Sequence, residues 1–387
     1  TLERKPIADC LGVDLPEVVK TLRWYAEAAD KVFGKTAPTG EGSLALIVKE
    51  PIGVVGAVLP WNFPLLMLAW KIAPALIAGN SVVVKPPELA SLTTIRMAEL
   101  AYEAGGPAGV FNVVPGLGHI AGKALGLHMD VDAVAFTGST EIGIQLLRES
   151  AETVKKCSME LGGNAPFLVF EDADIDAAIE GAMIAKMRNM GEACTAANRF
   201  YVHEKVSDEF SKKLTAKMAA LKMGNGLDDG VALGPLVNKE GLDKVVELVD
   251  DAVSKGAKIL TGGKAPGGTG YFYPATVLSN VSNDAKMLNE EIFGPVASLQ
   301  TFTDEAEVIK RANDTEYGLV AYLYTKDLGR GLRVSEKLDF GMIGLNRGLV
   351  SDPAAPFGGM KQSGIGREGA HEGLKEFLET QYISTSW

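Results

Sequence analysis

Apolar runs alternate with segments of helical period along the chain from residue 52 onward. In the first part the apolar runs predict strands and the periodic segments predict helices. The strands are expected at 52–59, 81–85, 110–114 and 133–136, and the helices at 65–78, 91–104, 120–127 and 140–151. Continuous apolar strands separated by helices predict a parallel sheet with helices on both faces. The predicted fold class is therefore α/β, with a doubly wound, Rossmann-like sheet.

The same alternation continues in the second part of the chain. After a strand at 155–161, helices are expected at 175–190, 207–221 and 242–255, with strands at 200–202 and 259–260. Two β-rich segments, Leu44–Lys49 and Gln381–Trp387, have no helix beside them. Exposed strands of this kind pair with each other or with a partner subunit.

Length, charge and cysteine count together indicate which classes of protein this chain can belong to. The 387 residues match two to three domains of about 150 residues each. With 38 basic and 49 acidic residues the net charge is −11, which argues against a broad nucleic-acid surface but permits a local anion site of backbone N–H groups. Three cysteines are too few for a disulfide framework, so a reducing compartment, the cytoplasm, is expected.

No membrane segment or secretion signal is expected. The most apolar stretch, 52–78, is interrupted by Pro60, Lys71 and Pro74, whereas a membrane span needs about 20 nearly unbroken apolar residues. The first residues lack an apolar signal core.

Glycine and proline follow several predicted strands, at the positions where doubly wound sheets bind ligands. The segment 136–143 (FTGSTEIG) ends a strand and opens a helix, so its N–H groups could receive a pyrophosphate. It is not G-x-G-x-x-G, and by spacing alone an ordinary strand–turn–helix junction is the commoner explanation. Lys85 and Glu88, just past another strand, belong either to a solvated turn or to a ribose-binding pair.

Cys194 lies between a predicted helix and a predicted strand, among small and polar residues. A lone cysteine is most often a small buried hydrophobe, but this setting is also typical of a thiol open to substrate. Glu160, beside Gly162-Gly163, is either a base at a strand end or a surface carboxylate, and Cys157 is expected to pack inside its strand. The four histidines show no metal-ligand spacing, so no metal is expected.

Seven motifs in register make the chain resemble the aldehyde dehydrogenase superfamily. They are PWNFP (60–64), KPPE (85–88), FTGSTEIG (136–143), MELGG (159–163), GEACTAANR (191–199), EEIFGPV (290–296) and PFGGMKQSGIGREG (356–369). The resemblance covers essentially the whole chain. It implies oxidation of an aldehyde to a carboxylic acid with NAD(P).

The resemblance also implies roles for three catalytic residues. Cys194 is expected to attack the aldehyde as a thiolate, giving a thiohemiacetal and then a thioester. The side chain of Asn62 and the N–H of Cys194 would form the oxyanion hole. Glu160 would be the general base that activates Cys194 or the hydrolytic water.

Nine residues match cofactor-binding positions of the family. They are Pro60, Trp61, Lys85, Glu88, Gly138, Ser139, Gly162, Glu291 and Phe293. Among them, Glu291 corresponds to the residue that holds the nicotinamide ribose. The Glu88 carboxylate would accept hydrogen bonds from the adenosine ribose and repel a 2′-phosphate, which favours NAD. Lys85 beside it could help to tolerate that phosphate, so NADP remains possible.

The segments 185–200 and 344–359 are similar to those of succinate-semialdehyde dehydrogenases. Arg188 and Ser351 match positions that bind the distal carboxylate in that group, whereas Trp70 replaces a second carboxylate-binding arginine. The first half is closer to enzymes for aminoaldehydes, such as γ-glutamyl-aminobutyraldehyde, or for aliphatic aldehydes. Succinate semialdehyde is the favoured substrate. The alternatives are a broad aliphatic or aminoaldehyde dehydrogenase and a catalytically silent member of the fold.

The resemblance predicts that the chain is divided into two domains and a β element. A cofactor domain comprises 1–31 and 51–162, a catalytic domain 163–362, and a β element for oligomerisation 32–50 with 378–387. Family members carry a further segment before the stretch that matches Thr1, so the cofactor domain is expected to be N-terminally incomplete. The expected partners are a small-molecule aldehyde and further copies of the chain in a homodimer or homotetramer, with neither nucleic acid nor membrane.

Overall fold

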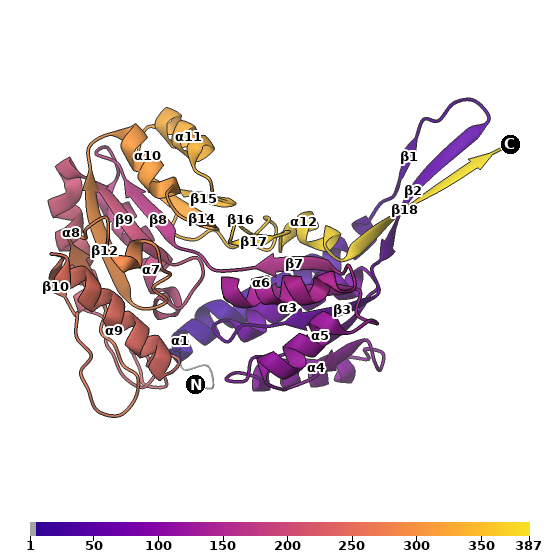
Figure 1. The fold of residues 1–387 in the computed structure, drawn as a ribbon, viewed down its shortest axis with the longest axis horizontal. Helices are drawn as coiled ribbons and strands as arrows, with labels where there is room; N and C mark the ends of the chain where they lie inside the picture. The colour runs from indigo at the N-terminus through magenta and orange to yellow at the C-terminus, as the bar shows by residue number, and fades with distance from the viewer. Residues whose placement is uncertain (1–4) are drawn as a thin grey trace. The chain divides into compact units, whose positions relative to one another are not determined.

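The computed structural model describes residues 5–387, which form two compact units (Figure 1). Unit 1 contains residues 5–13, Leu161–Ser351 and Gly358–Gly364, and unit 2 contains Asp14–Glu160, Asp352–Phe357 and Ile365–Trp387. Each unit is built around its own β-sheet. No helix within residues 5–387 has both the length and the apolar character needed to cross a membrane.

A six-stranded sheet with the order β17-β7-β6-β3-β4-β5 forms the centre of unit 2. Its strands are β17 (Gly364–Ile365), β7 (Lys156–Glu160), β6 (Ala133–Thr137), β3 (Val54–Val58), β4 (Ser81–Lys85) and β5 (Phe111–Val113). The pairs from β7 through to β5 are all parallel. Neighbouring strands bury Val55, Val82 and Val134, each at most 1 % exposed. The parallel α/β sheet predicted from the apolar runs is therefore confirmed.

The helices of unit 2 are α2 (Leu15–Ala28), α3 (Pro64–Ile77), α4 (Leu92–Glu103), α5 (Lys123–Leu127), α6 (Thr140–Ala151) and α12 (Ala370–Lys375). Four of them lie between these strands along the chain, whereas α2 precedes the strands and α12 follows them. The turn after α3 depends on Asn80, whose side-chain amide donates to the carbonyls of Ala75 (3.0 Å) and Phe377 (2.9 Å). Its Oδ1 accepts from the N–H of Gly53 at 2.8 Å, so one side chain joins the start of β4 to the segment before β3.

Two helix starts in unit 2 differ from the sequence-based prediction, which places a capping serine, Ser91, at the start of the helix 91–104 and begins another helix at residue 120. Ser91 occupies the N-cap position of α4, but its side chain makes no capping hydrogen bond because its backbone is already helical. The helix predicted from residue 120 begins instead as a π-helical turn, Gly118–Gly122, which leads into α5.

A seven-stranded sheet with the order β10-β11-β12-β9-β8-β14-β15 forms the centre of unit 1. Its strands are β10 (Lys258–Thr261), β11 (Thr276–Ser279), β12 (Val296–Phe302), β9 (Ala197–His203), β8 (Ala165–Val169), β14 (Val320–Tyr324) and β15 (Met342–Leu345). All neighbouring pairs are parallel except β10 with β11. The sequence-based prediction lacked β8, β11, β12, β14 and β15, since a short apolar run can equally be a buried helix segment.

The helices of unit 1 are α1 (Ile7–Asp9), α7 (Ile175–Met187), α8 (Glu204–Ala219), α9 (Lys239–Ser254), α10 (Glu305–Asn313) and α11 (Leu328–Lys337). Helix α7 ends three residues before its predicted end at Met190. A tight turn, Arg188–Gly191, follows it, and Asn189 and Met190 have φ angles of +48° and +57° there. Left-handed backbone at two consecutive residues cannot continue a right-handed helix. This early stop determines how the chain enters the loop that holds Cys194.

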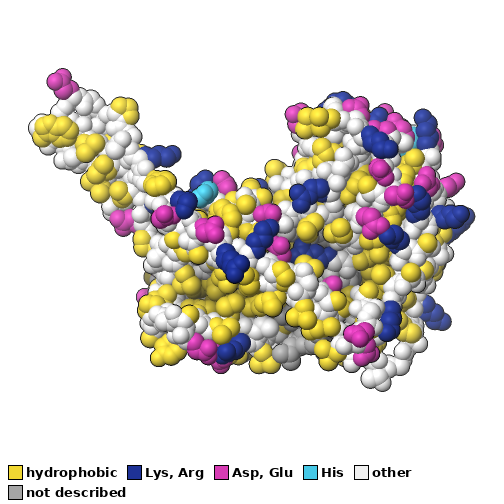
Figure 2. All heavy atoms as spheres, turned by 180° about the vertical axis from the view of Figure 1, so that it is seen from behind, with side chains coloured by type: hydrophobic (Ala, Val, Ile, Leu, Met, Phe, Trp, Pro, Cys, Tyr) yellow, Lys and Arg dark blue, Asp and Glu magenta, His cyan; other side chains and the backbone are white. Residues whose placement is uncertain are grey.

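The two β-rich segments without helices pair with each other, as one of the two predicted alternatives stated. β1 (Lys35–Ala37), β2 (Ser43–Pro51) and β18 (Leu378–Ser386) form an antiparallel sheet, in which β2 and β18 are in register from Pro51↔Leu378 to Ser43↔Ser386. Figure 1 shows this sheet extending from the rest of unit 2, and Figure 2 shows hydrophobic side chains along it. We call these three strands the β arm.

The compact units divide the chain differently from the predicted domains at four places, one of which is Leu161 and Gly162, predicted in the cofactor domain but part of unit 1. Residues 5–13 belong to unit 1, where the N–H of Ile7 donates to Gly226 at 2.8 Å. Residues 352–357 belong to unit 2, where Phe357 and Glu368 exchange two backbone hydrogen bonds of 2.7 Å. The β arm is part of unit 2 and not a separate unit.

Candidate active site

Cys194 is the accessible residue of a buried loop in unit 1. From residue 189 to residue 203 every residue is buried except Cys194, which is partly exposed. The loop is closed by a hydrogen bond of 3.0 Å from the N–H of Ala196 to the carbonyl of Ala193. It is also held by Tyr322 of β14, whose hydroxyl donates to the carbonyl of Thr195 at 2.9 Å. The surrounding packing therefore leaves Cys194 as the partly exposed residue of this segment.

The connection between β7 and β8 packs against the Cys194 loop. A Cβ atom on Gly163 would lie 2.3 Å from the carbonyl oxygen of Cys194, so this close approach requires glycine. The N–H of Gly163 donates to Glu291 Oε1 at 3.2 Å, and the carbonyl of Gly162 accepts from Ser363 Oγ at 2.6 Å. Gly163 thus links the thiol loop to Glu291.

Glu291 is half-buried and lies two residues before Phe293, whose φ is +52°. Burial raises the pKa of Glu291 to about 7, against the opposing effects of the Gly163 N–H, Lys244 and Lys186. This carboxyl group therefore changes protonation state near neutrality.

Arg188 and Ser351, the two predicted carboxylate-binding residues of unit 1, are brought together. Arg188 Nη1 lies 3.4 Å from Ser351 Oγ, although 163 positions separate them in sequence. Arg188 begins the tight turn after α7 and precedes Cys194 by six residues. A guanidinium and a hydroxyl at this separation can bind one carboxylate together.

Glu160 is buried in unit 2, so the surface-carboxylate alternative is wrong. It ends β7 with 2 % exposure, and neither of its carboxylate oxygens has a hydrogen-bond partner. Burial raises the pKa of Glu160 well above its usual range, Glu368 raises it further, and Lys71 and Arg367 act in the opposite direction. A carboxyl group with a raised pKa and unoccupied oxygens is suited to proton transfer near neutrality.

A buried ion pair acts electrostatically on this carboxyl group. Lys71 of α3 is bonded to Glu368 and donates to Thr137 Oγ1 at 2.6 Å, and both charged side chains are at most 4 % exposed. The pair connects α3 to the C-terminal part of unit 2.

The loop that contains Pro60, Trp61 and Asn62 lies directly before α3. Asn62 is 7 % exposed and sits two residues before the first residue of the helix. Trp70 of α3 is 2 % exposed, its ring meets that of Phe357 edge-on at 5.1 Å, and its indole nitrogen has no hydrogen-bond acceptor. Trp70 is thus a buried side chain of unit 2 that makes mainly apolar contacts.

Residues at the ends of β4 and β6 fit a dinucleotide. Lys85 is buried and pairs with Glu88 at 2.9 Å, while Glu88 also accepts from the N–H of Gly118. Burial opposes ionisation of Glu88, but its hydrogen bonds with Lys85 and the backbone hold its pKa below the usual value. The solvated-turn alternative therefore does not describe Lys85, although Glu88 is 41 % exposed and reachable.

The turn between β6 and α6 requires glycine at position 138. A Cβ on Gly138 would lie 2.4 Å from the ring of Phe136, and Ser139 caps α6 through a 3.4 Å bond from the N–H of Ile142. The first N–H groups of a twelve-residue helix therefore follow a strand end directly, the arrangement that binds pyrophosphate.

Sequence reasoning did not identify Tyr322 and Lys186. Tyr322 is one of several aromatic residues in apolar runs, so nothing in its local pattern distinguishes it. Lys186 had a weak signal, a lysine inside the otherwise apolar run IAKM. Among residues 5–387, no group of three or more His, Cys, Asp or Glu side chains is placed to hold a metal ion.

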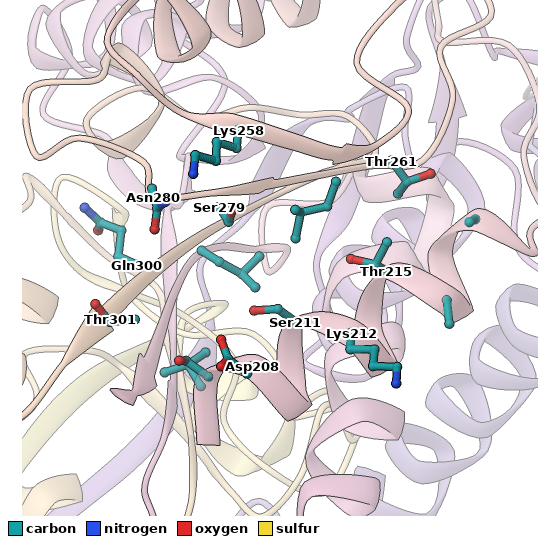
Figure 3. Close-up of a pocket in the computed structure, with 16 residues that line it drawn as sticks. Asp208, Ser211, Lys212, Thr215, Lys258, Thr261, Ser279, Asn280, Gln300 and Thr301 are labelled. Atoms are coloured by element: carbon teal, nitrogen blue, oxygen red, sulfur yellow. The ribbon is translucent and has the colours of Figure 1, made fainter. Parts of the chain in front are cut away.

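A separate cavity of about 640 Å³ lies in unit 1 between α8 and the ends of the strands β9 to β12 (Figure 3). Ser211 and Thr215 line it from α8, and Lys258 and Ser279 line it from the sheet. It shares no residue with the candidate site described above.

The two largely parallel sheets, the strand–turn–helix junction after β6 and the partly exposed Cys194 are features of an α/β oxidoreductase. The chain belongs to the aldehyde dehydrogenase family, whose sequence profile matches residues 2–383. It is accordingly an NAD(P)-dependent enzyme that oxidises aldehydes.

Three known proteins illustrate the similarity. The chain is 48 % identical over 388 residues to a glutarate-semialdehyde dehydrogenase of Pseudomonas putida, covering all of this chain and 80 % of the relative. It is 47 % identical over 385 residues to the NADP(+) succinate-semialdehyde dehydrogenase GabD of Escherichia coli, covering 99 % and 80 %. The NAD+ complex structure of a Bacillus cereus aldehyde dehydrogenase superimposes with a TM-score of 0.97 at 40 % identity, covering 100 % and 79 %.

Proposed function

We propose that this chain oxidises short aldehydes that carry a carboxylate at the far end, with succinate semialdehyde as the preferred substrate and succinate as the product. The observation that carries the proposal is the Arg188–Ser351 pair, 3.4 Å apart and in the same unit as Cys194. A distal carboxylate would gain charge-assisted hydrogen bonds there that a neutral aldehyde cannot form. Two relatives named for succinate and glutarate semialdehydes support this substrate class.

The proposed chemistry begins at the Cys194 thiolate. Its sulfur adds to the aldehyde carbon, and the carbonyl oxygen becomes the alkoxide of a thiohemiacetal. The amide of Asn62 and the N–H of Cys194 are proposed to stabilise that oxygen, and removing one such donor typically costs about 10²–10³ in rate. Loss of hydride from the tetrahedral carbon leaves the acyl group on sulfur as a thioester. Glu160 then takes a proton from water, which attacks the thioester and releases the acid and the thiol.

NAD(P), when bound, supplies the hydride acceptor. We propose that the turn Gly138-Ser139 and the N-terminus of α6 hold its phosphates and that Glu291 holds the nicotinamide ribose. Pro60, Trp61, Lys85, Gly162 and Phe293 are proposed to complete its site. Glu88 is proposed to bind the adenosine ribose, and its ionised state at neutral pH favours NAD over NADP.

The substrate is tested by the pre-steady-state burst of NADH at 340 nm. We expect a burst with succinate semialdehyde and higher kcat/KM for it than for propanal or an aminoaldehyde. The Cys194→Ala variant should abolish the burst and bind cofactor normally. Equal kcat/KM for propanal would contradict the proposed substrate class, and an unchanged burst in Cys194→Ala would contradict the mechanism.

The cofactor is tested by comparing kcat/KM with NAD and with NADP. We expect NAD to be preferred and Glu88→Ser to reduce that preference, because the substitution removes the charge that repels the 2′-phosphate. A clear preference of the unmodified enzyme for NADP would overturn the assignment.

Trp70 favours a second candidate, a broad aliphatic or aminoaldehyde dehydrogenase. It is buried, apolar and located where the resemblance places a second carboxylate-binding arginine in succinate-semialdehyde dehydrogenases. Substrate comparison with propanal therefore also decides between the two candidates.

We further propose that the chain assembles as a homodimer or homotetramer through its β arm and works in the cytoplasm. Tyr382 and Ile383 on β18 are 61 % and 42 % exposed, and each cysteine is a thiol and not part of a disulfide. Light scattering after chromatography should give a multiple of 40.9 kDa. The double variant Tyr382→Ser/Ile383→Ser should shift the mass toward the monomer.

A further inference from the structure

Gly348 lies in the segment 346–351, which follows β15 and ends at Ser351. It is buried and lies outside the regular helices and strands. A Cβ atom on Gly348 would lie 2.1 Å from the carbonyl oxygen of Gly181 in α7 and 2.7 Å from the Cα of Gly181. No side chain fits at such distances, so only glycine allows the segment to approach the backbone of α7 this closely.

The helix that Gly348 contacts is the one that leads to Arg188. Arg188 directly follows the last residue of α7 and is seven residues, or about 10 Å of helix, beyond Gly181. Ser351 is three residues beyond Gly348, which is at most about 11 Å of chain. Since Ser351 Oγ lies 3.4 Å from Arg188 Nη1, contacts at both ends place residues 348–351 beside the C-terminal half of α7.

The segment is also fixed where it leaves β15. Asn346 has a φ of +54°, the left-handed conformation that ends the strand and that asparagine adopts more readily than most residues. Its Oδ1 accepts from the N–H of Thr325 at 3.0 Å, and its Nδ2 donates to the carbonyl of Thr325 at 2.9 Å. Thr325 is itself held by Asp172, whose two carboxylate oxygens each lie 2.9 Å from the threonine hydroxyl. Asn346 therefore gives the segment a fixed starting point.

The Ser351 hydroxyl is sensitive to where this segment lies. A side chain at position 348 would have to move the segment away from α7 by about 1 Å or more to relieve the 2.1 Å approach. A hydroxyl binds only within hydrogen-bond distance, whereas the charge of a guanidinium acts over a longer range. A shift of this size would therefore separate Ser351 from a carboxylate that Arg188 holds.

We propose that Gly348 is a positioning residue for substrate selection: because it carries no side chain, the segment 346–351 lies against α7 and places the Ser351 hydroxyl beside the Arg188 guanidinium, where both bind the distal carboxylate of the aldehyde. The inference rests on the proposed function and adds the residue that sets the geometry of its carboxylate site. Gly348 acts through Ser351 and does not itself touch the substrate.

The test compares kcat/KM for succinate semialdehyde and for propanal in Gly348→Ala at saturating NAD. We expect the ratio of the two values to fall about tenfold, the effect of losing one hydrogen bond to a charged group. The loss should appear mainly as a higher KM for succinate semialdehyde. Oxidation of propanal should be nearly unchanged, because this aldehyde has no carboxylate for Ser351 to bind.

Two further glycines of unit 1 provide matched controls. A Cβ on Gly12 would have no atom within 4 Å, so Gly12→Ala should behave like the unmodified protein. A Cβ on Gly226 would lie 2.8 Å from the carbonyl oxygen of Lys5, so Gly226→Ala also forces two backbone segments apart, but away from the segment 346–351. Gly226→Ala should lower the thermal midpoint and leave the ratio of kcat/KM values unchanged. This pair separates a general loss of stability from a loss of carboxylate recognition.

A second set of variants tests whether Gly348 acts through Ser351. In the Ser351→Ala background, Gly348→Ala should lower the ratio no further, since the hydroxyl that it positions is already absent. If Gly348→Ala fails to fold, Asn346→Gly serves in the same assay. It keeps the left-handed turn but removes both hydrogen bonds to Thr325, so the ratio should fall, and an unchanged ratio would contradict the proposal.

The outcomes distinguish the inference from the proposed function. An unchanged ratio in Gly348→Ala, or an equal loss for both aldehydes, together with a ratio lowered by Arg188→Met, would overturn the role of Gly348 alone. An unchanged ratio in Arg188→Met would overturn the proposed substrate class and the inference with it.

Discussion

The hydroxyl of Tyr322 donates a 2.9 Å hydrogen bond to the carbonyl of Thr195, so a strand far along the chain holds the peptide that follows Cys194. Tyr322 is 1 % exposed, and burial raises the pKa of its phenol above the usual value. The hydroxyl therefore remains protonated, and a hydrogen-bond donor, at neutral pH. We regard this bond as the principal support of the thiol loop from β14.

Tyr322→Phe should loosen the Cys194 loop. The carbonyl of Thr195 would lose its partner in a buried place, which costs about 1–3 kcal/mol. We expect a lower thermal midpoint and a several-fold lower kcat, with cofactor affinity unchanged. Tyr324→Phe, which removes a hydroxyl two residues along the same strand, is the matched control. An unchanged kcat in Tyr322→Phe would show that the loop is held by other contacts.

Glu160→Gln should slow hydrolysis of the thioester more than its formation. The pKa of Glu160 is raised by burial, so the ionised base accumulates as the pH rises, and kcat should increase through this range. The amide cannot take a proton, so this rising limb should disappear, with a steady-state kcat about 10²–10⁴-fold lower. Rapid-quench and stopped-flow measurements should still find a burst of NADH. Retention of the limb in the variant would assign it to another group.

Arg188→Met should impair only substrates that carry a carboxylate. A charge-assisted hydrogen bond contributes about 1.5–3 kcal/mol, which corresponds to roughly 10- to 100-fold in kcat/KM for succinate semialdehyde. Propanal has no carboxylate and should be oxidised at nearly the same rate as before. Ser351→Ala should show a smaller defect of the same kind. An equal loss for both aldehydes would mean that Arg188 supports the loop and does not bind substrate.

The Lys71–Glu368 pair should be essential to the stability of unit 2. Both side chains are buried, so Lys71→Met or Glu368→Gln leaves one group without its charged partner, at a cost of about 3–5 kcal/mol. The double variant should be less destabilised than the sum of the two. Asp243→Asn breaks an exposed ion pair with Lys239 and should cost under about 1 kcal/mol. Thermal unfolding curves of the four variants check this order.

The sequence predicted the parallel part of unit 2 well, because its strands are apolar and its helices have clear ends. The bounds of β4 and α6 agree with the expected 81–85 and 140–151. Prediction was poorer in unit 1, where strands such as β8 and β14 are buried on both faces. A short apolar run can be a strand or a buried helix segment, and β8 and β14 were therefore not identified, although the equally buried β6 of unit 2 was.

Some residues of the candidate site could likewise be predicted from the sequence, and others could not. Cys194, Glu160, Arg188 and Glu291 lie in motifs that can be read locally. Tyr322 and Lys186 are identified only by their contacts in the folded chain. Tyr322 donates to Thr195, and Lys186 donates to Asn198. Nothing in the sequence around Glu160 indicated whether it was buried or on the surface, and its burial is what raises its pKa.

The sequence by itself determined the family, the order of strands and helices in unit 2, and the residue types available for chemistry, because these are recorded in local patterns. Tertiary structure decided which of those residues are buried, paired or accessible. It left Cys194 accessible in a buried loop, brought Arg188 to Ser351, and enclosed Lys186. The physical reason is that desolvation and packing depend on atoms from distant segments, so a charge or a thiol acquires its properties only when the chain has folded around it.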